Sequence, residues 1–283
     1  MIDTHDLAVP ESELSPPYSR YADFYDRLNQ STFSTRLAQE MLTYFEGIGH
    51  FPGKVLDLAC GTGAAAHLYA QRGCKVVGLE RSNQMLAHAK RRADGQTDIR
   101  FLEGDLRDLR AIRLNESFDL VSCYFDSINY LLLEEEIVSC FQAVHALTVP
   151  GGFFVFDVPT RSGFTELWDN ATHVAIDEPD LFGLYRSSYD PVTRLSPLQL
   201  TIFQRVGSDE TATWTRFDEC HTERAYTLSE LTSALSAAGY TVTECFDVRD
   251  NGASLLPSGD ESAHRVAFVA QRLTELTPAG NVD

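Results

Sequence analysis

Glycines and acidic residues near residue 60 have the types and spacing of a nucleoside-binding site. The stretch "VLDLACGTG" runs from apolar residues into Gly61 and Gly63, and Glu80 follows Gly61 by 19 residues. Glycines between a strand and a helix let backbone N–H groups approach an anionic group of a ligand. An acid at this spacing accepts hydrogen bonds from ribose hydroxyls. Two classes of cofactor use this layout.

Asp57 distinguishes between the two classes. It lies four residues before Gly61, close to where the pyrophosphate of a nicotinamide dinucleotide would lie, and a carboxylate there would repel phosphate oxygens. The same carboxylate favours a ligand with a cationic amine, while the glycine turn receives a carboxylate. S-adenosylmethionine has both groups and a positive sulfonium. We therefore expect S-adenosylmethionine as cofactor, with a nicotinamide-dependent oxidoreductase as the less favoured alternative.

Two later segments place further side chains at predicted strand ends. "FLEGDLRDL" puts Asp105 where it accepts from an adenine amine, with Leu106 beside it to pack on the ring. "FDLVSCYFDSINYLL" puts Tyr124, Phe125 and Asp126 after the next strand. Ligands of open α/β sheets bind outside the carboxyl ends of the strands. We expect these strand ends to meet in one crevice.

Alternating strand and helix patterns provide the elements that position these groups. Such alternation predicts an α/β fold with a mainly parallel sheet covered on both faces. A later helix is expected between a capping box of Thr227 with Glu230 and a stop at Gly239. The predicted strands are 54–58, 75–79, 99–102, 118–124, 152–158, 241–248 and 264–270, and the predicted helices are 63–72, 83–93, 134–147 and 228–238.

Residues 159–226 interrupt this alternation. They are too many for a crossover, and "LYRSSYD", "LQLTIFQRV" and "ATWTRFDECHTERAY" have strand-like alternation, with "GSDE" as a turn between the last two. We expect a small antiparallel β cover domain inserted here. The predicted organisation is a flexible tail (1–17), N-terminal lid helices (18–50), a cofactor-binding domain (51–158 and 227–272), the cover domain (159–226) and a second flexible tail (273–283).

Composition argues against several classes of protein. The formal net charge of −18 opposes a nucleic-acid partner, because nucleic-acid affinity relies on Lys and Arg. The sequence has no run of 18 apolar residues and no signal-peptide pattern, so no membrane partner is expected. Six scattered cysteines are typical of reduced thiols in a cytoplasmic protein, and eight dispersed histidines predict no metal site. We expect a monomer or homodimer.

Taken together, the motifs resemble those of class I S-adenosylmethionine-dependent methyltransferases over residues 21–272. "VLDLACGTG", "VVGLERSNQMLAHAK", "GDLRDL", "FDLVSCYFDSINYL" and "LTVPGGFFVFDV" are similar to successive motifs of that class. The resemblance implies a doubly wound, seven-stranded, mainly parallel sheet in the order 3-2-1-4-5-7-6, with strand 7 antiparallel. "YADFYDRLN" and the cover domain resemble bacterial small-molecule enzymes, including sugar-amine N-methyltransferases and an uncharacterised related group.

The same resemblance implies the reaction. It is methyl transfer to nitrogen or oxygen of a small polar metabolite by in-line displacement. The segment "YFDS" is not the Asn/Asp-Pro-Pro-aromatic pattern of enzymes that methylate nucleobase or glutamine amines. A non-catalytic protein that binds S-adenosylmethionine or its homocysteine product is an alternative.

The resemblance also implies residue roles on the cofactor side. Tyr25 would lie beside the sulfonium, as a catalytic residue, and Glu80 would bind both ribose hydroxyls. The residues expected to bind the cofactor are Tyr25, Asp57, Ala59, Cys60, Gly61, Gly63, Glu80, Arg81, Ser82, Met85, Gly104, Asp105, Leu106, Tyr124 and Phe125.

The acceptor side depends on which way one predicted strand faces. In "TRFDECHTE", alternation puts Phe217, Glu219, His221 and Glu223 on one face. If that face looks onto the crevice, His221 with Glu219 accepts a proton or holds a polar substrate; if it looks outward, these side chains are solvated. With His221 as the second expected catalytic residue, the expected substrate-binding residues are Asp126, Asn129, Tyr130, Trp168, Glu219, His221, Arg224 and Tyr226.

Overall fold

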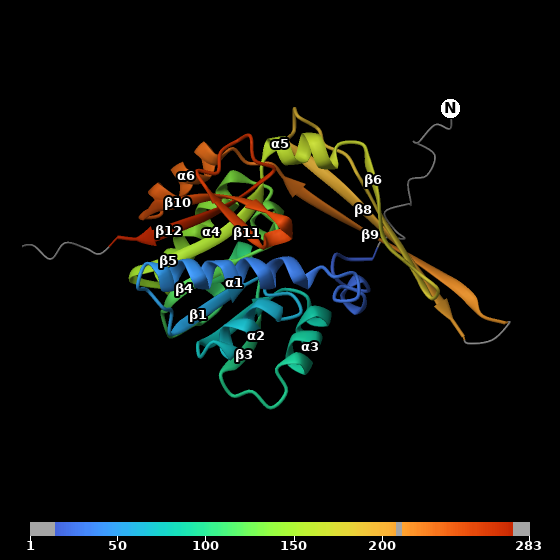
Figure 1. The fold of residues 1–283 in the computed structure, drawn as a ribbon, viewed down its shortest axis with the longest axis horizontal. Helices are drawn as coiled ribbons and strands as arrows, with labels where there is room; N and C mark the ends of the chain where they lie inside the picture. The colour runs from blue at the N-terminus through green and yellow to red at the C-terminus, as the bar shows by residue number, and fades with distance from the viewer. Residues whose placement is uncertain (1–14, 208–210, 274–283) are drawn as a thin grey trace, which may run out of the picture.

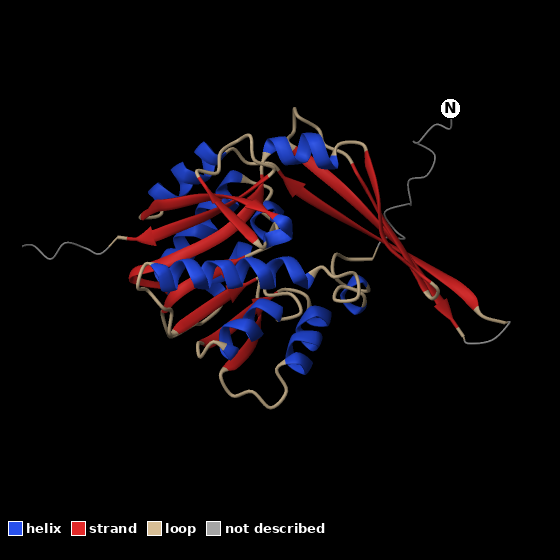
Figure 2. Cartoon of the chain, in the orientation of Figure 1, coloured by secondary structure: helices blue, strands red, loops and turns tan. Residues whose placement is uncertain are grey.

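The structure is a computed structural model that describes residues 15–207 and 211–273. Helices lie on both faces of a large twisted sheet, and a second, smaller sheet extends away from it (Figures 1 and 2). Most of the two predicted tails lies outside the described residues. None of the helices within the described ranges is long and apolar enough to cross a membrane.

The large sheet contains eight strands in the order β11-β10-β12-β5-β4-β1-β2-β3. Neighbours among β1 to β5 pair in parallel, whereas β12 is antiparallel to both β5 and β10. The predicted order 3-2-1-4-5-7-6 with an antiparallel strand 7 is confirmed, and the short strand β11 adds an edge that was not predicted. The strands are β1 (Lys54–Leu58), β2 (Lys75–Glu80), β3 (Ile99–Glu103), β4 (Phe118–Cys123), β5 (Thr148–Pro159), β10 (Tyr240–Arg249), β11 (Ser254–Pro257) and β12 (Arg265–Arg272).

Five longer helices accompany this sheet in the described chain. The predicted capping box of the last one is present: Thr227 Oγ1 accepts from Glu230 N at 3.1 Å, and Thr227 N donates to Glu230 Oε2 at 2.8 Å. Such a pair satisfies N–H groups that a helix start leaves free. The helices are α1 (Ser31–Gly47), α2 (Ala64–Gln71), α3 (Asn83–Arg92), α4 (Glu134–Leu147) and α6 (Leu228–Ala237).

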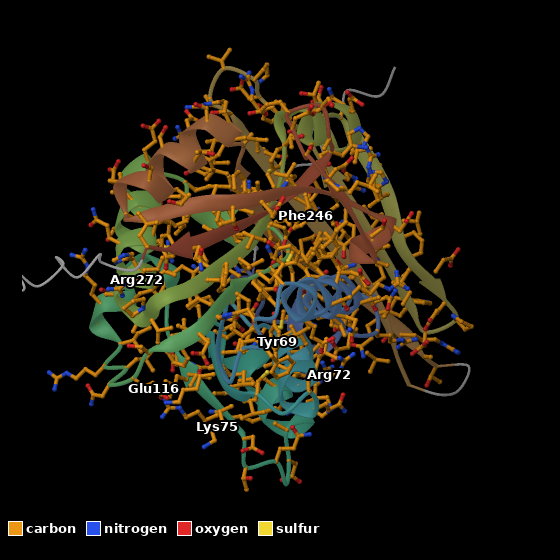
Figure 3. The ribbon with its side chains drawn as sticks, turned by 60° about the vertical axis from the view of Figure 1, so that its left-hand side comes forward. Tyr69, Arg72, Lys75, Glu116, Phe246 and Arg272 are labelled. Atoms are coloured by element: carbon orange, nitrogen blue, oxygen red, sulfur yellow. The ribbon has the colours of Figure 1, made fainter. Side chains whose placement is uncertain are left out.

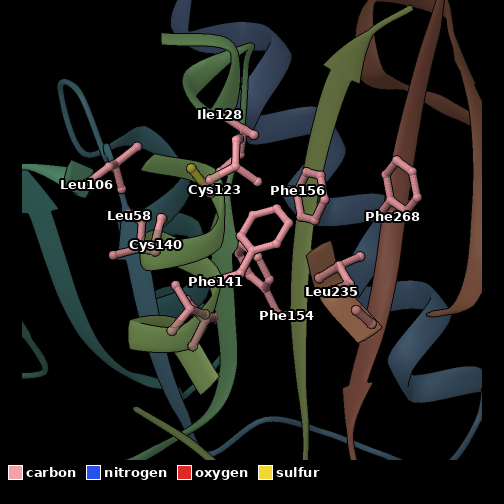
Figure 4. Close-up of a cluster of buried hydrophobic side chains, with 14 of the residues drawn as sticks. Leu58, Leu106, Cys123, Ile128, Cys140, Phe141, Phe154, Phe156, Leu235 and Phe268 are labelled. Carbon is pink, nitrogen blue, oxygen red and sulfur yellow. The ribbon is translucent and has the colours of Figure 1, made fainter. Parts of the chain in front are cut away.

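The strands contribute alternately to two cores, one on each face of the sheet. Val55 joins the cluster under α1 and α2, which also holds Tyr69 of α2 and Phe246 of β10 (Figure 3). Leu56 joins the cluster under α4 and α6, where Phe141 packs on Phe154 and Phe156 of β5, and Phe156 stacks on Phe268 of β12 (Figure 4). Strands buried on both faces form continuous apolar runs, which is why the sequence located them well.

The N-terminal region differs from the predicted lid helices at 18–50. Tyr21–Asp23 form a single 3-10 turn, η3, followed by further turns up to Gln30. The long helix α1 is a layer of the main domain, with Leu37 and Met41 fully buried against the sheet. The segment before α1 extends over the carboxyl ends of the strands, between α3 and β9 (Figure 1).

The inserted sheet is antiparallel, as predicted, with the order β6-β7-β8-β9. Its last three strands correspond to the three predicted ones, while β6 was not predicted. Of the predicted turn "GSDE", only Gly207 belongs to the described residues. The strands are β6 (Ala171–Glu178), β7 (Leu181–Ser187), β8 (Leu195–Val206) and β9 (Thr213–Arg224).

Candidate active site

A first cavity lies at the carboxyl ends of the parallel strands. It is bounded by the glycine turn after β1, the ends of β2, β3 and β4, and the N-terminal segment. Predicted cofactor-binding residues that line it are Tyr25, Asp57, Ala59, Cys60, Gly61, Glu80, Arg81, Met85, Gly104, Asp105, Leu106, Tyr124 and Phe125. Further lining residues that were not predicted are Tyr18, Ser31, Ser34, Thr62, Ala64, Ala65, Arg107, Ser127 and Leu131, together with Tyr130.

Asp57 lies buried in the wall of the first cavity, with 2% of its surface exposed. It pairs in register with Ser122 of β4, whose hydroxyl donates to Asp57 Oδ1 at 2.8 Å. Asp57 Oδ2 has no hydrogen-bond partner among the described residues. Burial raises the pKa of the Asp57 carboxyl to about 7, although Ser122 and the backbone of Ala66 oppose the shift. An unpartnered, buried carboxyl oxygen beside a cavity favours a cationic ligand group.

Glu80 at the end of β2 joins the glycine turn to the start of α3. Its Oε2 accepts from Gly61 N at 3.1 Å, and its Oε1 accepts from Ser82 N at 2.8 Å. Burial raises the pKa of the Glu80 carboxyl, whereas these backbone donors lower it. The carboxylate is therefore held at the cavity wall, where it can accept from hydroxyl groups of a ligand.

Two predicted cofactor-binding residues, Gly63 and Ser82, do not line the first cavity. Gly63 has φ +75° and a Cβ there would lie 2.8 Å from the Phe101 ring, so glycine lets α2 begin close to β3. Ser82 caps α3 by accepting from Met85 N at 3.2 Å, and its hydroxyl donates to Tyr18 O at 2.7 Å. Both residues support the cavity without forming its surface.

Asp105 at the end of β3 is engaged by arginine. Its Oδ1 accepts from Arg107 Nε and from Arg107 N, each at 2.9 Å, and Arg81 Nη1 lies 3.7 Å from Oδ2. These contacts outweigh partial burial and lower the pKa of the carboxyl. Asp105 is thus an ionised acceptor at the cavity rim.

A second cavity lies between the end of the large sheet and the inserted sheet. It shares Tyr18, Tyr25, Phe125 and Tyr130 with the first cavity, so these four side chains form a common wall. The predicted substrate-binding residues that line it are Asp126, Tyr130, Trp168 and His221. The remaining lining residues are Tyr21, Gln30, Phe164, Tyr185, Ser196, Leu198 and Glu223.

The tyrosines of the common wall are neutral donors. Burial raises the pKa of Tyr18, Tyr25 and Tyr130 well above the usual value for a phenol. The hydroxyls of Tyr18 and Tyr130 lie 2.9 Å apart, and Tyr130 Oη lies 2.9 Å from His221 Nδ1. These phenols can orient a ligand through hydrogen bonds, but they are not bases at neutral pH.

The face of β9 that carries His221 looks inward, onto the N-terminal segment and the second cavity. Phe217, Glu219 and His221 are all buried, and His221 is 4% exposed. His221 Nε2 lies 3.6 Å from Glu219 Oε2 and has no hydrogen-bond partner among the described residues. The first of the two orientations considered for this strand is the one observed.

Four predicted substrate-binding residues do not line either cavity. Glu219 is fully buried, and it accepts from the backbone N–H groups of Tyr18 and Tyr21 and from the Ser19 hydroxyl. The other three join the end of β9 to the loop after β4. Asn129 Nδ2 donates to Arg224 O at 2.9 Å, Arg224 Nη1 donates to Leu132 O at 2.9 Å, and the Tyr226 hydroxyl donates to Leu131 O. The hydrogen bonds of these four side chains are thus made within the chain itself, and a role for them in substrate binding stays a prediction.

A charged cluster that the sequence analysis did not identify borders the second cavity. The Arg265 guanidinium on β12 pairs with both Asp126 and Asp157, and it lies over the rings of Phe33 and Phe125. Half-buried Glu223 on β9 lies near these groups. Burial and the charges of the two aspartates raise its pKa well above the usual range, and Arg265 opposes the shift. Alternation places Glu223 on the same face of β9 as His221, but the sequence analysis assigned Glu223 no role.

No group of three or more His, Cys, Asp or Glu side chains within residues 15–207 and 211–273 is arranged to hold a metal ion.

Comparisons with known proteins identify the family. A family model described as a methyltransferase domain matches residues 55–152. A putative methyltransferase of Geobacillus sp. is 30% identical over 260 residues, 90% of this chain and 99% of that protein. The dTDP-3-amino-3,4,6-trideoxy-alpha-D-glucopyranose N,N-dimethyltransferase of Streptomyces venezuelae is 34% identical over 103 residues, 36% of this chain and 41% of that protein. The crystal structure of an S-adenosylmethionine-dependent methyltransferase from Clostridium acetobutylicum has a TM-score of 0.75 at 22% identity, covering 91% of this chain and 99% of that one.

With this fold and these similarities, the chain belongs to the class I S-adenosylmethionine-dependent methyltransferases. Within the class, it is similar over 90% of its length to the putative methyltransferase of Geobacillus sp., and over 36% of its length to a sugar N,N-dimethyltransferase. The nicotinamide alternative is thereby set aside.

Proposed function

We propose that the enzyme methylates a nitrogen or oxygen atom of a small polar molecule bound in the second cavity, with S-adenosylmethionine in the first. The observation that carries this proposal is the common wall of Tyr18, Tyr25, Phe125 and Tyr130. A methyl group leaving one cavity at this wall enters the other directly. The side chains at this junction are aromatic and half-buried.

The residues of the first cavity fit the cofactor. Asp57 Oδ2, buried and without a partner among the described residues, suits the cationic amine, and Glu80 suits the ribose hydroxyls. Asp105 and Leu106 lie at the rim, where an adenine would bind. When bound, S-adenosylmethionine supplies an electrophilic methyl group on a sulfonium.

The protein's contribution to the reaction is mainly orientation. Alignment of two bound reactants lowers the barrier by about 7 to 11 kcal/mol. A general base adds roughly 10²- to 10⁴-fold in rate, which corresponds to about 3 to 5 kcal/mol. Tyr25 and Tyr130 are phenol donors in the common wall. His221 lines the second cavity, and its Nε2 has no hydrogen-bond partner among the described residues. These groups position the acceptor atom against the methyl group.

The test is a methyl-transfer assay with isotopically labelled cofactor and a panel of small amines, alcohols and phenols, read by mass spectrometry. Transfer to at least one acceptor, lost in Asp57→Asn, is the expected result. Tight binding of the cofactor with no transfer to any acceptor would instead favour the non-catalytic binding protein.

A further inference from the structure

We propose that the acceptor is a cationic amine without phosphate groups and that Glu223 takes its proton, an inference that rests on the proposed methyl transfer. Four observations at the second cavity support this proposal: the charge of the cluster beside it, its lining, a buried histidine nitrogen without a partner among the described residues, and the position of Glu223.

Charge is the first observation. Asp126, Asp157 and Glu223 face a single guanidinium, that of Arg265, which already pairs with both aspartates. The Glu223 side chain accepts no hydrogen bond from the residues that the structure describes. When Glu223 is ionised, the cluster carries an excess of two negative charges. A bound ammonium group compensates this excess, whereas a phosphate increases the repulsion.

The lining of the second cavity is the second observation. It contains neither Lys nor Arg within the described chain, although phosphate binding relies on such side chains. It does contain the aromatic rings of Tyr21, Tyr185 and Trp168 besides the common wall. Aromatic faces attract cations, so the lining favours the same ligand charge as the carboxylates do.

His221 supplies the third observation. It is 4% exposed and lines the second cavity, and its Nε2 has no hydrogen-bond partner among the described residues. A buried ring nitrogen without a partner is costly unless a ligand or water satisfies it. His221 therefore provides a polar contact for the acceptor beside Glu223.

The position of Glu223 allows it to act as the proton acceptor. An ammonium group has no lone pair, so an N–H bond must break before a C–N bond can form. Its proton forms an O–H bond on the Glu223 carboxylate, and the N–H electron pair stays on nitrogen. That lone pair then bonds to the methyl carbon, and the C–S electron pair remains on the thioether. Glu223 returns its proton to water, and the product is a methylammonium.

The surroundings of Glu223 suit this role. Its pKa is raised by burial and by Asp126 and Asp157, while Arg265 lowers it, and Tyr18 and Tyr130 are the other titratable groups that interact with it. A carboxylate whose pKa lies closer to the working pH is a stronger base. The inference departs from the Streptomyces venezuelae relative, whose name specifies a dTDP-linked sugar.

The first experiment measures binding by calorimetry in the presence of saturating S-adenosylhomocysteine. Two matched sets of probes are used: glucosamine, glucose and glucosamine 6-phosphate, and benzylamine, benzyl alcohol and benzyl phosphate. In at least one set, we expect the amine to bind at least tenfold more tightly than the neutral and phosphorylated partners.

Glu223→Gln should abolish this preference and Glu223→Asp should retain part of it. Glu135→Gln, a change at an exposed site on α4, is the control. No amine preference in either set, tighter binding of a phosphate, or an unchanged preference in Glu223→Gln overturns the proposal.

The second experiment follows turnover of a methylated amine against pH. For the wild type, kcat/KM should rise with pH and then level off as Glu223 ionises. Glu223→Gln should lower kcat by about 10²-fold and remove that rise, while the KM for the cofactor stays unchanged. An unaltered pH profile in Glu223→Gln rules out proton transfer to Glu223. An amine preference in binding with no transfer to any acceptor would sink the proposed function and leave the amine site standing.

Discussion

Replacing Asp57 by Asn should make the cofactor-free protein more stable at neutral pH. Asp57 has a pKa near 3.8 when unfolded and about 7 when folded, because burial disfavours its charge. Between these two values, the folded state keeps a proton that the unfolded state has lost. The free energy of unfolding therefore falls as pH rises through this window, and it falls no further from this group above it.

The size of the effect follows from the shift. A difference of about 3 pKa units corresponds to about 4 kcal/mol. An asparagine is neutral throughout, so Asp57→Asn does not suffer this loss. As the pH rises from 4 to 8, it passes the unfolded-state pKa of 3.8 and the folded-state pKa of about 7. Over this range, the free energy of unfolding of the variant should increase by about 4 kcal/mol relative to that of the wild type.

The assay is urea unfolding of the cofactor-free protein, followed by circular dichroism at several pH values. Asp98→Asn, at an exposed position before β3, serves as the matched control and should parallel the wild type. Calorimetry in buffers of different ionisation enthalpy should also show proton release when wild type binds S-adenosylmethionine at neutral pH, and none in Asp57→Asn. Parallel stability curves for wild type and Asp57→Asn would refute the reasoning that burial strains this carboxyl.

Three further predictions concern the two cavities and the short helix α5 (Arg161–Gly163). Glu80→Gln should weaken cofactor binding tenfold to hundredfold in calorimetry, because charge-assisted hydrogen bonds contribute about 1.5 to 3 kcal/mol. Tyr25→Phe and His221→Ala should each lower turnover more than cofactor affinity, and unchanged turnover in both would contradict their placement around the acceptor. Gly163→Ala should lower the free energy of unfolding by about 1 to 3 kcal/mol in urea titrations, because its Cβ would lie 2.1 Å from His264 O; a wild-type midpoint would refute this.

The large sheet could be predicted from the sequence because its strands are buried on both faces. Continuous apolar runs, a capping box and glycine stops located those strands and helices within a few residues. Strand β6 was missed because "ATHVAIDE" is largely exposed and lacks regular alternation. Strand β11 was missed because it has four residues and is itself the edge of the sheet, paired with β10 alone among the described strands.

The site could be predicted only where side chains follow a parallel strand directly. Asp57, Glu80 and Asp105 are brought together by strand order alone, so their common cavity followed from the pattern. Tyr18 and Arg265 reach the site from segments that are distant in the sequence. Motif spacing does not predict where such segments lie in the folded chain, so these two residues were not identified. On the acceptor side, a polar residue near the crevice need not line the cavity. Asn129, Glu219 and Arg224 instead make hydrogen bonds that join β9 to neighbouring segments of the chain.

Glu219 holds the N-terminal segment through the backbone of Tyr18 and Tyr21 and the hydroxyl of Ser19. The same segment is bonded to the large sheet's side of the site, where the Thr62 hydroxyl after β1 donates to Asp26 and the Ser82 hydroxyl after β2 donates to Tyr18 O. If β9 moves when an acceptor binds, these contacts carry the movement to Tyr18 and Thr62, which line the first cavity. Linkage then requires the effect to be mutual, so each ligand alters the affinity for the other by the same factor. Such cooperativity between the two substrates would arise from the contacts that join β9, the N-terminal segment and the large sheet.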